Sequence, residues 1–389
     1  MKLLILTFYY APDLGAGSFR TTALVQSLSA TAPHAEIDVV TSLPNRYRSF
    51  SAEAPEYEVH GNVRIHRLAL PAHASGMLDQ SKAFGSFALQ ALRHVRGHRY
   101  DLVYATSSRL MTAALGALVA RRSGARLYLD IRDIFVDTIK DVLPRRFATL
   151  AHPVFSLIER WTMNRADRIN LVSPGFAEYF RTRYPHRPLS FFTNGIDDEF
   201  IAAAAAPIPP RHERPSPATI LYAGNIGEGQ GLHAIVPALA RALRGRARFV
   251  IVGDGGRRDA LLAAVAGIDN VEICPPVKRD ALIAAYREAD VLFLHLNDYD
   301  AFRKVLPSKL FEYAAMGKPI LAGVAGQAAE FIRAEIENAA VFPPCDAVQA
   351  VAAFNTLALR HTPRPTFVEK YARTRIMAAL ADDILALCA

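Results

Sequence analysis

The alternation of short apolar runs with helical patterns is the feature that most constrains the fold of this chain. In both halves, runs rich in β-branched residues are separated by segments with helical spacing. Such alternation is typical of right-handed βαβ units around a parallel sheet, so the sequence predicts an α/β protein. The expected strands of the first half are residues 2–8, 37–41, 63–68, 102–105, 126–131 and 168–172. Those of the second half are residues 219–223, 248–252, 271–274, 291–295 and 319–322.

A stretch without a core-forming period separates the two halves. Alanines at 202–206 are followed by a proline-rich segment at 207–217. With 389 residues, the chain is long enough for two domains that each bury a core. We therefore predict two Rossmann-like domains facing a central cleft, with a boundary near this stretch. Ligands are expected where loops leave the carboxyl ends of the strands.

Composition excludes several classes of protein. The start of the chain does not resemble a signal peptide, and no uncharged apolar run reaches the roughly 18 residues of a membrane span. Cys274, Cys345 and Cys388 are scattered without metal-ligand spacing, which favours a reduced, cytoplasmic compartment. The net charge of +8 allows nucleic acid, an anionic membrane surface or a phosphorylated substrate as a partner. Aromatic and basic residues do not interleave in any one segment, so we expect no nucleic acid partner.

The strongest local signal is residues 306–320, LPSKLFEYAAMGKPI. Ser308 is a favourable N-cap, and a helix that starts in a cleft offers free backbone N–H groups to a diphosphate. Lys309 in the first turn is well placed for a phosphate, and Glu312 is placed to accept hydrogen bonds from two ribose hydroxyls. Leu310 packs inward beneath them. The alternative is a capped surface helix in which Glu312 only complements the helix dipole.

A glycine loop with Gly15 and Gly17 follows the first strand and precedes a helix. Arg20 stands where the third glycine of a dinucleotide fingerprint belongs, which argues against a nicotinamide or flavin cofactor. The alternative is a tight turn that needs glycine only for its backbone angles.

Asp130, Arg132 and Asp133 follow another expected strand. Either aspartate is a candidate partner or base for an acceptor hydroxyl, with Arg132 orienting that hydroxyl or an acceptor phosphate. The alternative is a surface ion cluster.

These segments together resemble the family-4 retaining glycosyltransferases, and in particular the bacterial WbuB-like branch of O-antigen and capsule enzymes. Each segment is a weak signal alone, but all occur in the expected order along nearly the whole chain. The segments that carry the resemblance are residues 9–20, 130–135, 194–197, 224–227, 253–255, 306–320 and 367–377.

The resemblance implies the GT-B fold, an acceptor domain at residues 1–200 and a donor domain at residues 201–365. The closing helix, about 366–389, would cross back to the first domain. It also implies retention at the anomeric carbon, a nucleotide-sugar donor, no required metal, and a lipid-diphosphate-linked saccharide acceptor in surface polysaccharide synthesis. A uridine nucleotide is the expected carrier, an N-acetylated hexosamine is one candidate sugar, and no separate cofactor or metal is expected. The remaining donor-binding residues expected by resemblance are Gly15, Gly17, Arg20, Gly227, Gly253, Val277 and Arg303.

Two departures from the family pattern concern charge. Lys304 stands where the family often has the first of two glutamates spaced eight apart, the second being Glu312. Glu228 and Gln230 stand where the family tends to place an arginine and a lysine that neutralise the diphosphate. We therefore expect Arg303, Lys304 and Lys309 to supply the missing cations, with Lys304 acting in catalysis. The nearest candidate for a metal pair is the Asp298-Tyr299-Asp300 segment, and we expect no metal there.

Residues 143–158 combine basic and apolar side chains as an interfacial helix does. This favours a peripheral location at the inner face of the membrane, whereas the alternative is a set of solvated helix faces. Two rival functions stay open. One is a catalytically silent scaffold in a polysaccharide assembly complex, which the missing glutamate and cations favour. The other is a nucleotide-sugar epimerase of the same double fold.

Overall fold

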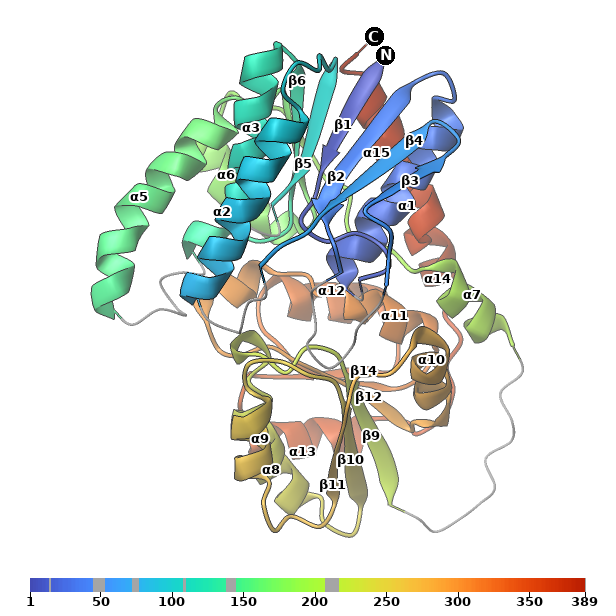
Figure 1. Ribbon diagram of the computed structural model, residues 1–389. Helices are drawn as coiled ribbons and strands as arrows, with labels where there is room; N and C mark the ends of the chain where they lie inside the picture. The colour runs from blue at the N-terminus through green and yellow to red at the C-terminus, as the bar shows by residue number, and fades with distance from the viewer. Residues whose placement is uncertain are drawn as a thin grey trace. The chain divides into compact units, whose positions relative to one another are not determined.

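The computed structural model describes residues 1–13, 15–44, 53–71, 77–107, 110–137, 145–206 and 217–388 (Figure 1). The chain forms two compact units, residues 1–194 with 373–389 (unit 1) and residues 195–372 (unit 2). The predicted proline-rich boundary at residues 207–216 lies outside the described residues. No helix of the described ranges is long and apolar enough to cross a membrane.

Unit 1 is built on an eight-stranded sheet in the order β3-β4-β2-β1-β5-β6-β7-β8. Neighbouring strands of this sheet pair in parallel, except that β3 and β4 are antiparallel. The strands are β1 Lys2–Leu6, β2 Glu36–Ser42, β3 Tyr57–His60, β4 Val63–Leu68, β5 Leu102–Thr106, β6 Arg126–Ile131, β7 Arg168–Leu171 and β8 Leu189–Ser190. The helices are α1 Ala16–Thr31, α2 Met77–His94, α3 Leu110–Ser123, α5 Arg145–Met163, the 3₁₀ turn η1 Pro174–Phe176, α6 Ala177–Arg183 and α15 Arg373–Leu385.

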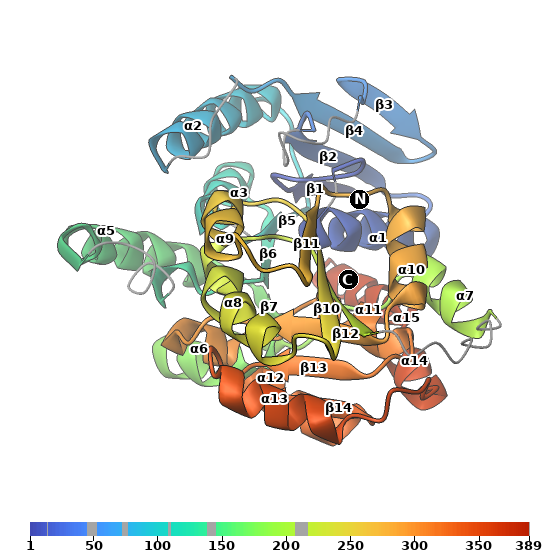
Figure 2. The same ribbon diagram turned by 90° about the horizontal axis from the view of Figure 1, so that it is seen from below.

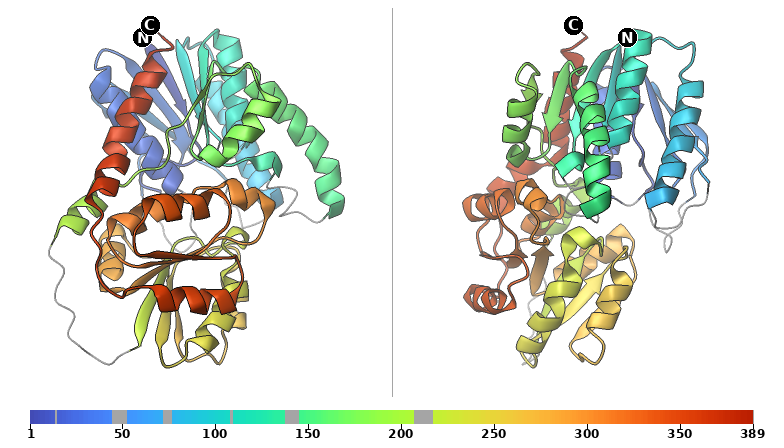
Figure 3. Two further views of the ribbon diagram at one scale, coloured as in Figure 1. Left: turned by 180° about the vertical axis from the view of Figure 1, so that it is seen from behind. Right: turned by 90° about the vertical axis from the view of Figure 1, so that its left-hand side faces the viewer.

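The C-terminal helix α15 belongs to unit 1 and packs beside α1 (Figure 3). Its apolar face is buried with α1 and the first strands, and Met377, Leu380 and Ile384 are fully enclosed. Asp383 fixes the helix to the sheet. Its carboxylate accepts hydrogen bonds from the Tyr128 hydroxyl at 2.7 Å and from Arg168 Nη1 at 2.6 Å.

Unit 2 is built on a six-stranded parallel sheet in the order β11-β10-β9-β12-β13-β14. The strands are β9 Ala218–Ala223, β10 Ala247–Val252, β11 Val271–Cys274, β12 Val291–His295, β13 Ile320–Gly323 and β14 Ala339–Phe342. The helices are α7 Asp198–Ala205, α8 Leu232–Ala242, α9 Arg258–Ala264, α10 Arg279–Glu288, α11 Lys309–Ala315, α12 Gln327–Glu335, α13 Ala347–Thr356 and α14 Pro365–Tyr371, with 3₁₀ turns η2 Glu228–Gln230 and η3 Asp300–Lys304.

Helices lie on both sides of the unit 2 sheet (Figure 2), and an apolar core fills the space on each side. Helices α8, α9 and α13 bury residues on one face, and α7, α10, α11, α12 and α14 bury residues on the other. In chain order the six strands run 3-2-1-4-5-6 across the sheet, which is the order of the dinucleotide-binding fold. The crevice expected for a ligand in such a sheet lies where the order reverses, beyond the carboxyl ends of β9 and β12.

The predicted α/β class with two Rossmann-like domains is confirmed, and every strand expected from the sequence is present. The boundaries of the compact units differ from the expected domain boundaries. Phe200 and Phe367, both expected in the first domain, pack in the core of unit 2. Ile196 and Tyr371 lie beside the two places where the chain passes from one unit to the other. Ile196 donates its backbone N–H to the Tyr371 carbonyl at 2.8 Å, so these two segments are bonded to each other within unit 2.

Three strands were not expected from the sequence, namely β3, β8 and β14. The glycine loop expected before the first helix is partly helical. Helix α1 begins at Ala16, so Gly17 lies inside it and not in a loop before it.

Candidate functional site

Two glycine loops interlock at the carboxyl ends of β9 and β10. A Cβ atom on Gly253 would overlap the carbonyl oxygen of Gly224, so no larger residue fits there. Gly224 itself has a φ of +140°, and its backbone N–H donates to the Val252 carbonyl at 2.8 Å. The loops therefore lie flat against each other at the point where the sheet order predicts a ligand.

Lys309 brings a cation to this glycine loop from the start of α11. Its ammonium lies 3.9 Å from the ring centroid of Tyr222, at the end of β9. It also contacts the position that a Cβ of Gly224 would fill. Burial lowers the pKa of Lys309 to about 7, although the nearby Glu312 carboxylate favours the charged form. The ammonium is therefore costly to hold without an anion.

Glu312 lies one turn further along α11. The Tyr286 hydroxyl, on α10, donates to Glu312 Oε2 at 3.4 Å. Tyr286 is fully buried, and burial raises its pKa well above the usual value, so this hydroxyl stays a donor. Arg279 at the start of α10 adds a positive charge near the carboxylate and is itself paired with Asp197.

The helix expected within residues 306–320 is confirmed as α11, but its cap differs from the expectation. Ser308 is the N-cap residue, yet its side chain makes no capping hydrogen bond because its backbone is already helical. Leu310 is fully buried, as expected. Gly317, with a φ of +65°, follows the end of the helix.

The carboxyl end of α11 is held by a buried arginine that sequence analysis missed. Arg364 donates to the carbonyl oxygens of Ala314 at 2.9 Å, Lys318 at 3.0 Å and Glu337 at 2.6 Å. Burial lowers the pKa of Arg364 to about 10, still well above neutrality. A charged guanidinium thus satisfies carbonyl groups that a helix end leaves without partners.

The loop after β9 carries Glu228 and Gln230 in place of the family's cations. Glu228 pairs with Arg257, which comes from the loop after β10, and accepts a hydrogen bond from the Tyr299 hydroxyl at 2.6 Å. This hydrogen bond is the main reason that the pKa of Glu228 is lowered, with Arg257 adding to it. Gln230 accepts from the Asn225 side chain at 2.8 Å, which closes the turn at Gly227.

His295 joins this loop to two others. The fully buried imidazole bonds the Gln230 carbonyl through Nδ1 at 2.7 Å and accepts from the Cys345 backbone N–H at Nε2, at 2.9 Å. Accepting at Nε2 requires a neutral ring with its proton on Nδ1. Burial lowers the pKa of His295 to about 4, in agreement with that tautomer.

The remaining residues expected in the donor site lie around these loops. Val277 is partly buried in the segment between β11 and α10. Lys304 ends η3 and is half-buried. Arg303 is exposed and pairs with Asp298 at 3.2 Å and Asp300 at 3.6 Å, so its cation lies between the two aspartates.

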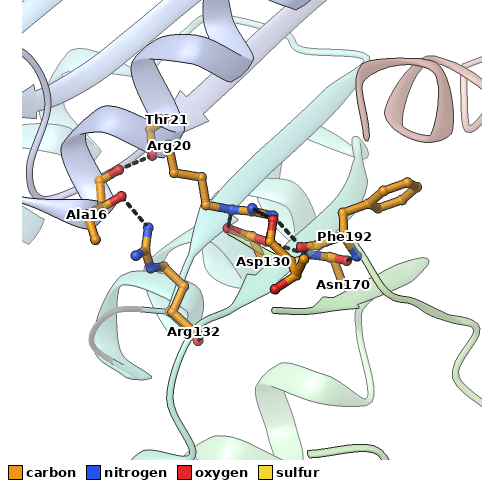
Figure 4. A network of polar contacts seen from close by, with 10 residues as sticks. Ala16, Arg20, Thr21, Asp130, Arg132, Asn170 and Phe192 are labelled. Atoms are coloured by element: carbon orange, nitrogen blue, oxygen red, sulfur yellow. Dashed lines mark hydrogen bonds and ion pairs between the residues drawn. The ribbon is translucent and has the colours of Figure 1, made fainter. Parts of the chain in front are cut away.

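In unit 1, Arg20 and Asp130 form a buried ion pair (Figure 4). Arg20 donates to both carboxylate oxygens, Nε to Oδ2 at 2.9 Å and Nη2 to Oδ1 at 3.0 Å, and both side chains are 0 % exposed. Arg20 also donates to the Phe192 and Thr193 carbonyls, and Asn170 donates to Asp130 at 2.6 Å. Burial works to raise the pKa of Asp130, but the charge of Arg20 outweighs it and holds the carboxyl ionised.

This placement changes the roles expected for two residues. With Arg20 donating to the protein and Asp130 accepting from it, neither side chain is exposed to a donor or to an acceptor hydroxyl. Their bonds instead join α1, β6 and β7. We therefore leave Arg20 and Asp130 out of the proposed site, as residues that support it.

Arg132 and Asp133 differ from that pair. Arg132 Nη1 donates to the Ala16 carbonyl at 3.2 Å and packs against Gly17, so the structure brings Arg132 to the glycine loop as well (Figure 4). Burial lowers the pKa of Arg132 to about 10, so the group stays charged at neutral pH. Asp133 is exposed beside it, and Gly15 is partly exposed just before α1.

Sequence reasoning missed Tyr222, Tyr286, His295 and Arg364. In the sequence, each reads as an ordinary residue of a strand, a helix or a loop. Their contacts, with Lys309, Glu312, Gln230 and Ala314 respectively, become visible only in the folded structure.

Comparisons with known proteins agree with this arrangement. The glycosyl transferase 4-like domain matches residues 15–195, and the glycosyl transferases group 1 family matches residues 217–359. WcaI of Escherichia coli (strain K12), named as a colanic acid biosynthesis glycosyl transferase, is 28% identical over 345 residues, which cover 82% of each chain.

Two solved structures show the same fold. WaaG, a glycosyltransferase involved in lipopolysaccharide biosynthesis, matches with a TM-score of 0.64 at 15% identity, over 100% of this chain and 97% of that one. A UDP-forming alpha,alpha-trehalose-phosphate synthase from Burkholderia xenovorans matches with a TM-score of 0.68 at 13% identity, over 99% of each chain. With a glycosyl transferase 4-like domain matched in the first unit, a glycosyl transferases group 1 domain matched in the second, and the whole fold shared with GT-B enzymes, the chain is a glycosyltransferase of the GT-B fold.

Proposed function

We propose that this glycosyltransferase moves a sugar, with retention, from a uridine diphosphate carrier to a lipid-diphosphate-linked saccharide in bacterial surface polysaccharide synthesis. The observation that carries the proposal is the ammonium of Lys309 held against the glycine loop at the end of β9, with Glu312 one turn away on α11. A cation and a carboxylate at this spacing suit a diphosphate and a ribose.

Lys309 is the residue we assign to the diphosphate. The leaving nucleoside diphosphate gains negative charge as the bond to the sugar breaks, and a fixed cation stabilises that charge. Tyr222 and Gly224 contact the ammonium at the carboxyl end of β9. The cation that the loop after β9 lacks in its own sequence is thus supplied from α11. Arg303 and Lys304 are further candidates on η3.

Glu312 is the residue we assign to the ribose. An ionised carboxylate accepts hydrogen bonds only, which fits two vicinal hydroxyls. The Tyr286 hydroxyl donates to Oε2 at 3.4 Å and so helps to orient the carboxylate. The seven-residue α11 is short, and Arg364 fixes its far end, so the position of Glu312 is set by the core of unit 2.

For the acceptor we assign Asp133 and Arg132 in unit 1. Asp133 is the exposed carboxylate of the expected cluster, and it is suited to orient or deprotonate an acceptor hydroxyl. Within the described ranges, the Arg132 guanidinium donates one hydrogen bond, from Nη1 to the Ala16 carbonyl. Its other N–H groups suit an acceptor phosphate.

The remaining details rest on resemblance. Retention follows the family likeness, and WcaI and WaaG, by their names, act in surface polysaccharide synthesis. A uridine carrier is supported by the UDP-forming synthase that shares the fold. Direct displacement on one face of the sugar, without a covalent enzyme intermediate, suits a donor side whose expected first glutamate is Lys304.

The test is release of nucleoside diphosphate from a panel of nucleotide sugars, with and without a lipid-linked saccharide. The proposal predicts release from one donor, faster with acceptor, and loss of release in Glu312→Gln. A silent scaffold would release nothing from any donor. An epimerase would convert the sugar while it stayed attached to the nucleotide.

A further inference from the structure

Helix α5 lies at the edge of unit 1 (Figure 1), and large apolar side chains on it are exposed to solvent. Val154 is 57% exposed and Leu157 is 70% exposed, and both are large hydrophobic side chains. Trp161 follows at helical spacing, so the three side chains lie on one face of the helix. Exposed apolar residues grouped on one helix face mark an interaction surface.

The single acidic residue of α5 faces the opposite way. Glu159 is 3% exposed, and its Oε1 accepts hydrogen bonds from the Tyr179 hydroxyl at 2.8 Å and the Tyr184 hydroxyl at 2.7 Å. Burial raises the pKa of Glu159, although both tyrosine hydrogen bonds oppose that effect. These tyrosines come from α6 and the residue after it, so Glu159 fixes the buried side of α5 to the unit.

The exposed side of α5 carries cations instead. Arg160 is exposed beside the apolar stripe. Arg165, just after the helix, stacks on the Trp161 ring at 4.3 Å from its centroid and donates to the Trp161 carbonyl at 3.4 Å. A tryptophan with an arginine beside exposed aliphatic side chains suits the boundary between lipid headgroups and acyl chains.

The charge of the whole chain is distributed in the same sense. Unit 1 has 26 lysine and arginine residues against 17 aspartate and glutamate residues, whereas unit 2 has 19 against 20. The whole excess of positive charge therefore belongs to the unit that carries α5. The net positive charge of unit 1 is complementary to an extended anionic surface.

We propose that the exposed face of α5, formed by Val154, Leu157, Arg160 and Trp161, docks on an anionic lipid bilayer. The apolar stripe enters the headgroup region, and the arginines pair with lipid phosphates. This inference gives a place to the lipid-linked acceptor of the proposed function, but it does not depend on sugar transfer. The first part of the expected interfacial segment, residues 143 and 144, lies outside the described residues.

The experiment is co-sedimentation of the full chain with vesicles. One set contains phosphatidylglycerol with phosphatidylethanolamine, and the other contains phosphatidylcholine alone. We expect binding to the anionic vesicles, weakened by salt, and little binding to the neutral ones. Arg160→Gln should weaken binding about fivefold, because one basic residue near an anionic membrane surface changes the affinity by about that factor.

The decisive variant is the double substitution Val154→Ser with Leu157→Ser. Both side chains are exposed, so the fold should be retained, and circular dichroism checks this. We expect at least a tenfold loss of vesicle binding. The matched control is Val348→Ser on α13 of unit 2, where an 81% exposed valine should be replaced without effect.

Three results would overturn the proposal. They are absence of parent binding to anionic vesicles, equal binding to neutral vesicles, and parent-like binding of the folded double variant. Because the assay contains no sugar, it separates this inference from the proposed function. If the chain binds vesicles but releases no nucleotide, this inference stands and the proposed function fails. If it releases nucleotide but binds no vesicles, the proposed function stands and this inference fails.

Discussion

Replacing Lys309 by methionine tests the assignment of the diphosphate cation. Methionine keeps an apolar stem against Tyr222 and removes only the charge. In the parent, burial sets the pKa of Lys309 to about 7, so about half of the free protein carries the ammonium at pH 7 and about one hundredth at pH 9. If the diphosphate binds the ammonium form, binding takes up a proton above pH 7.

The sign and size of the effect follow from this protonation. The affinity of the parent for uridine diphosphate should fall roughly 50-fold between pH 7 and pH 9, because the terminal phosphate is already ionised in that range. Lys309→Met should bind about tenfold to 100-fold more weakly at pH 7, since charged hydrogen bonds contribute about 1.5–3 kcal/mol. Its affinity should be flat with pH.

Isothermal titration calorimetry in two buffers of different ionisation enthalpy measures both the affinity and the proton uptake. Lys370→Met is the control, because that ammonium forms a surface ion pair with Glu335 at 2.7 Å. The reasoning would be refuted by a parent affinity that does not change between pH 7 and pH 9. Equal affinities of Lys309→Met and the parent at pH 7 would refute it as well.

Three further predictions concern Glu312, His295 and Arg20. Glu312→Gln should weaken uridine diphosphate binding by about tenfold, and an unchanged titration curve would remove the ribose assignment. His295 is neutral in the fold with a pKa of about 4, so its contribution is complete above about pH 6.5 and is lost as the pH falls to 4. Hydrogen exchange of β12 should show about 3 kcal/mol of acid destabilisation in the parent that His295→Gln lacks; equal pH dependence would contradict this. Arg20→Met should lower the free energy of unfolding of unit 1 by about 3–5 kcal/mol, because Asp130 is left buried without its partner. Fluorescence of the single tryptophan, in unit 1, reports this loss, and a variant as stable as the parent would contradict the supporting role.

Much of the fold follows from local patterns in the sequence. Buried parallel strands read as continuous apolar runs, and β1, β5 and β12 are buried along their whole length or nearly so. The strand β3 was missed because Tyr57–His60 is an exposed edge strand without an apolar run. The two-residue β8 is too short to give a pattern.

The site was predictable only where the functional residues share one segment. Ser308, Lys309 and Glu312 are neighbours in the sequence, so their motif was visible. Arg20 follows a glycine loop in the sequence, and this position suggested that it binds a ligand. In the fold its partner is Asp130, which lies 110 residues away in the sequence. Likewise, only the fold shows that Lys309 reaches Gly224 and supplies the cation missing from that loop.

The most direct test of the central claim is hydrogen exchange of the full chain with and without saturating uridine diphosphate. Our account places the nucleotide on unit 2, against the loop after β9 and the start of α11. We predict slower exchange in peptides that cover residues 222–231 and 309–316, and loss of that protection in the Lys309→Met variant. Protection confined to unit 1, with these two segments unchanged, would contradict the account.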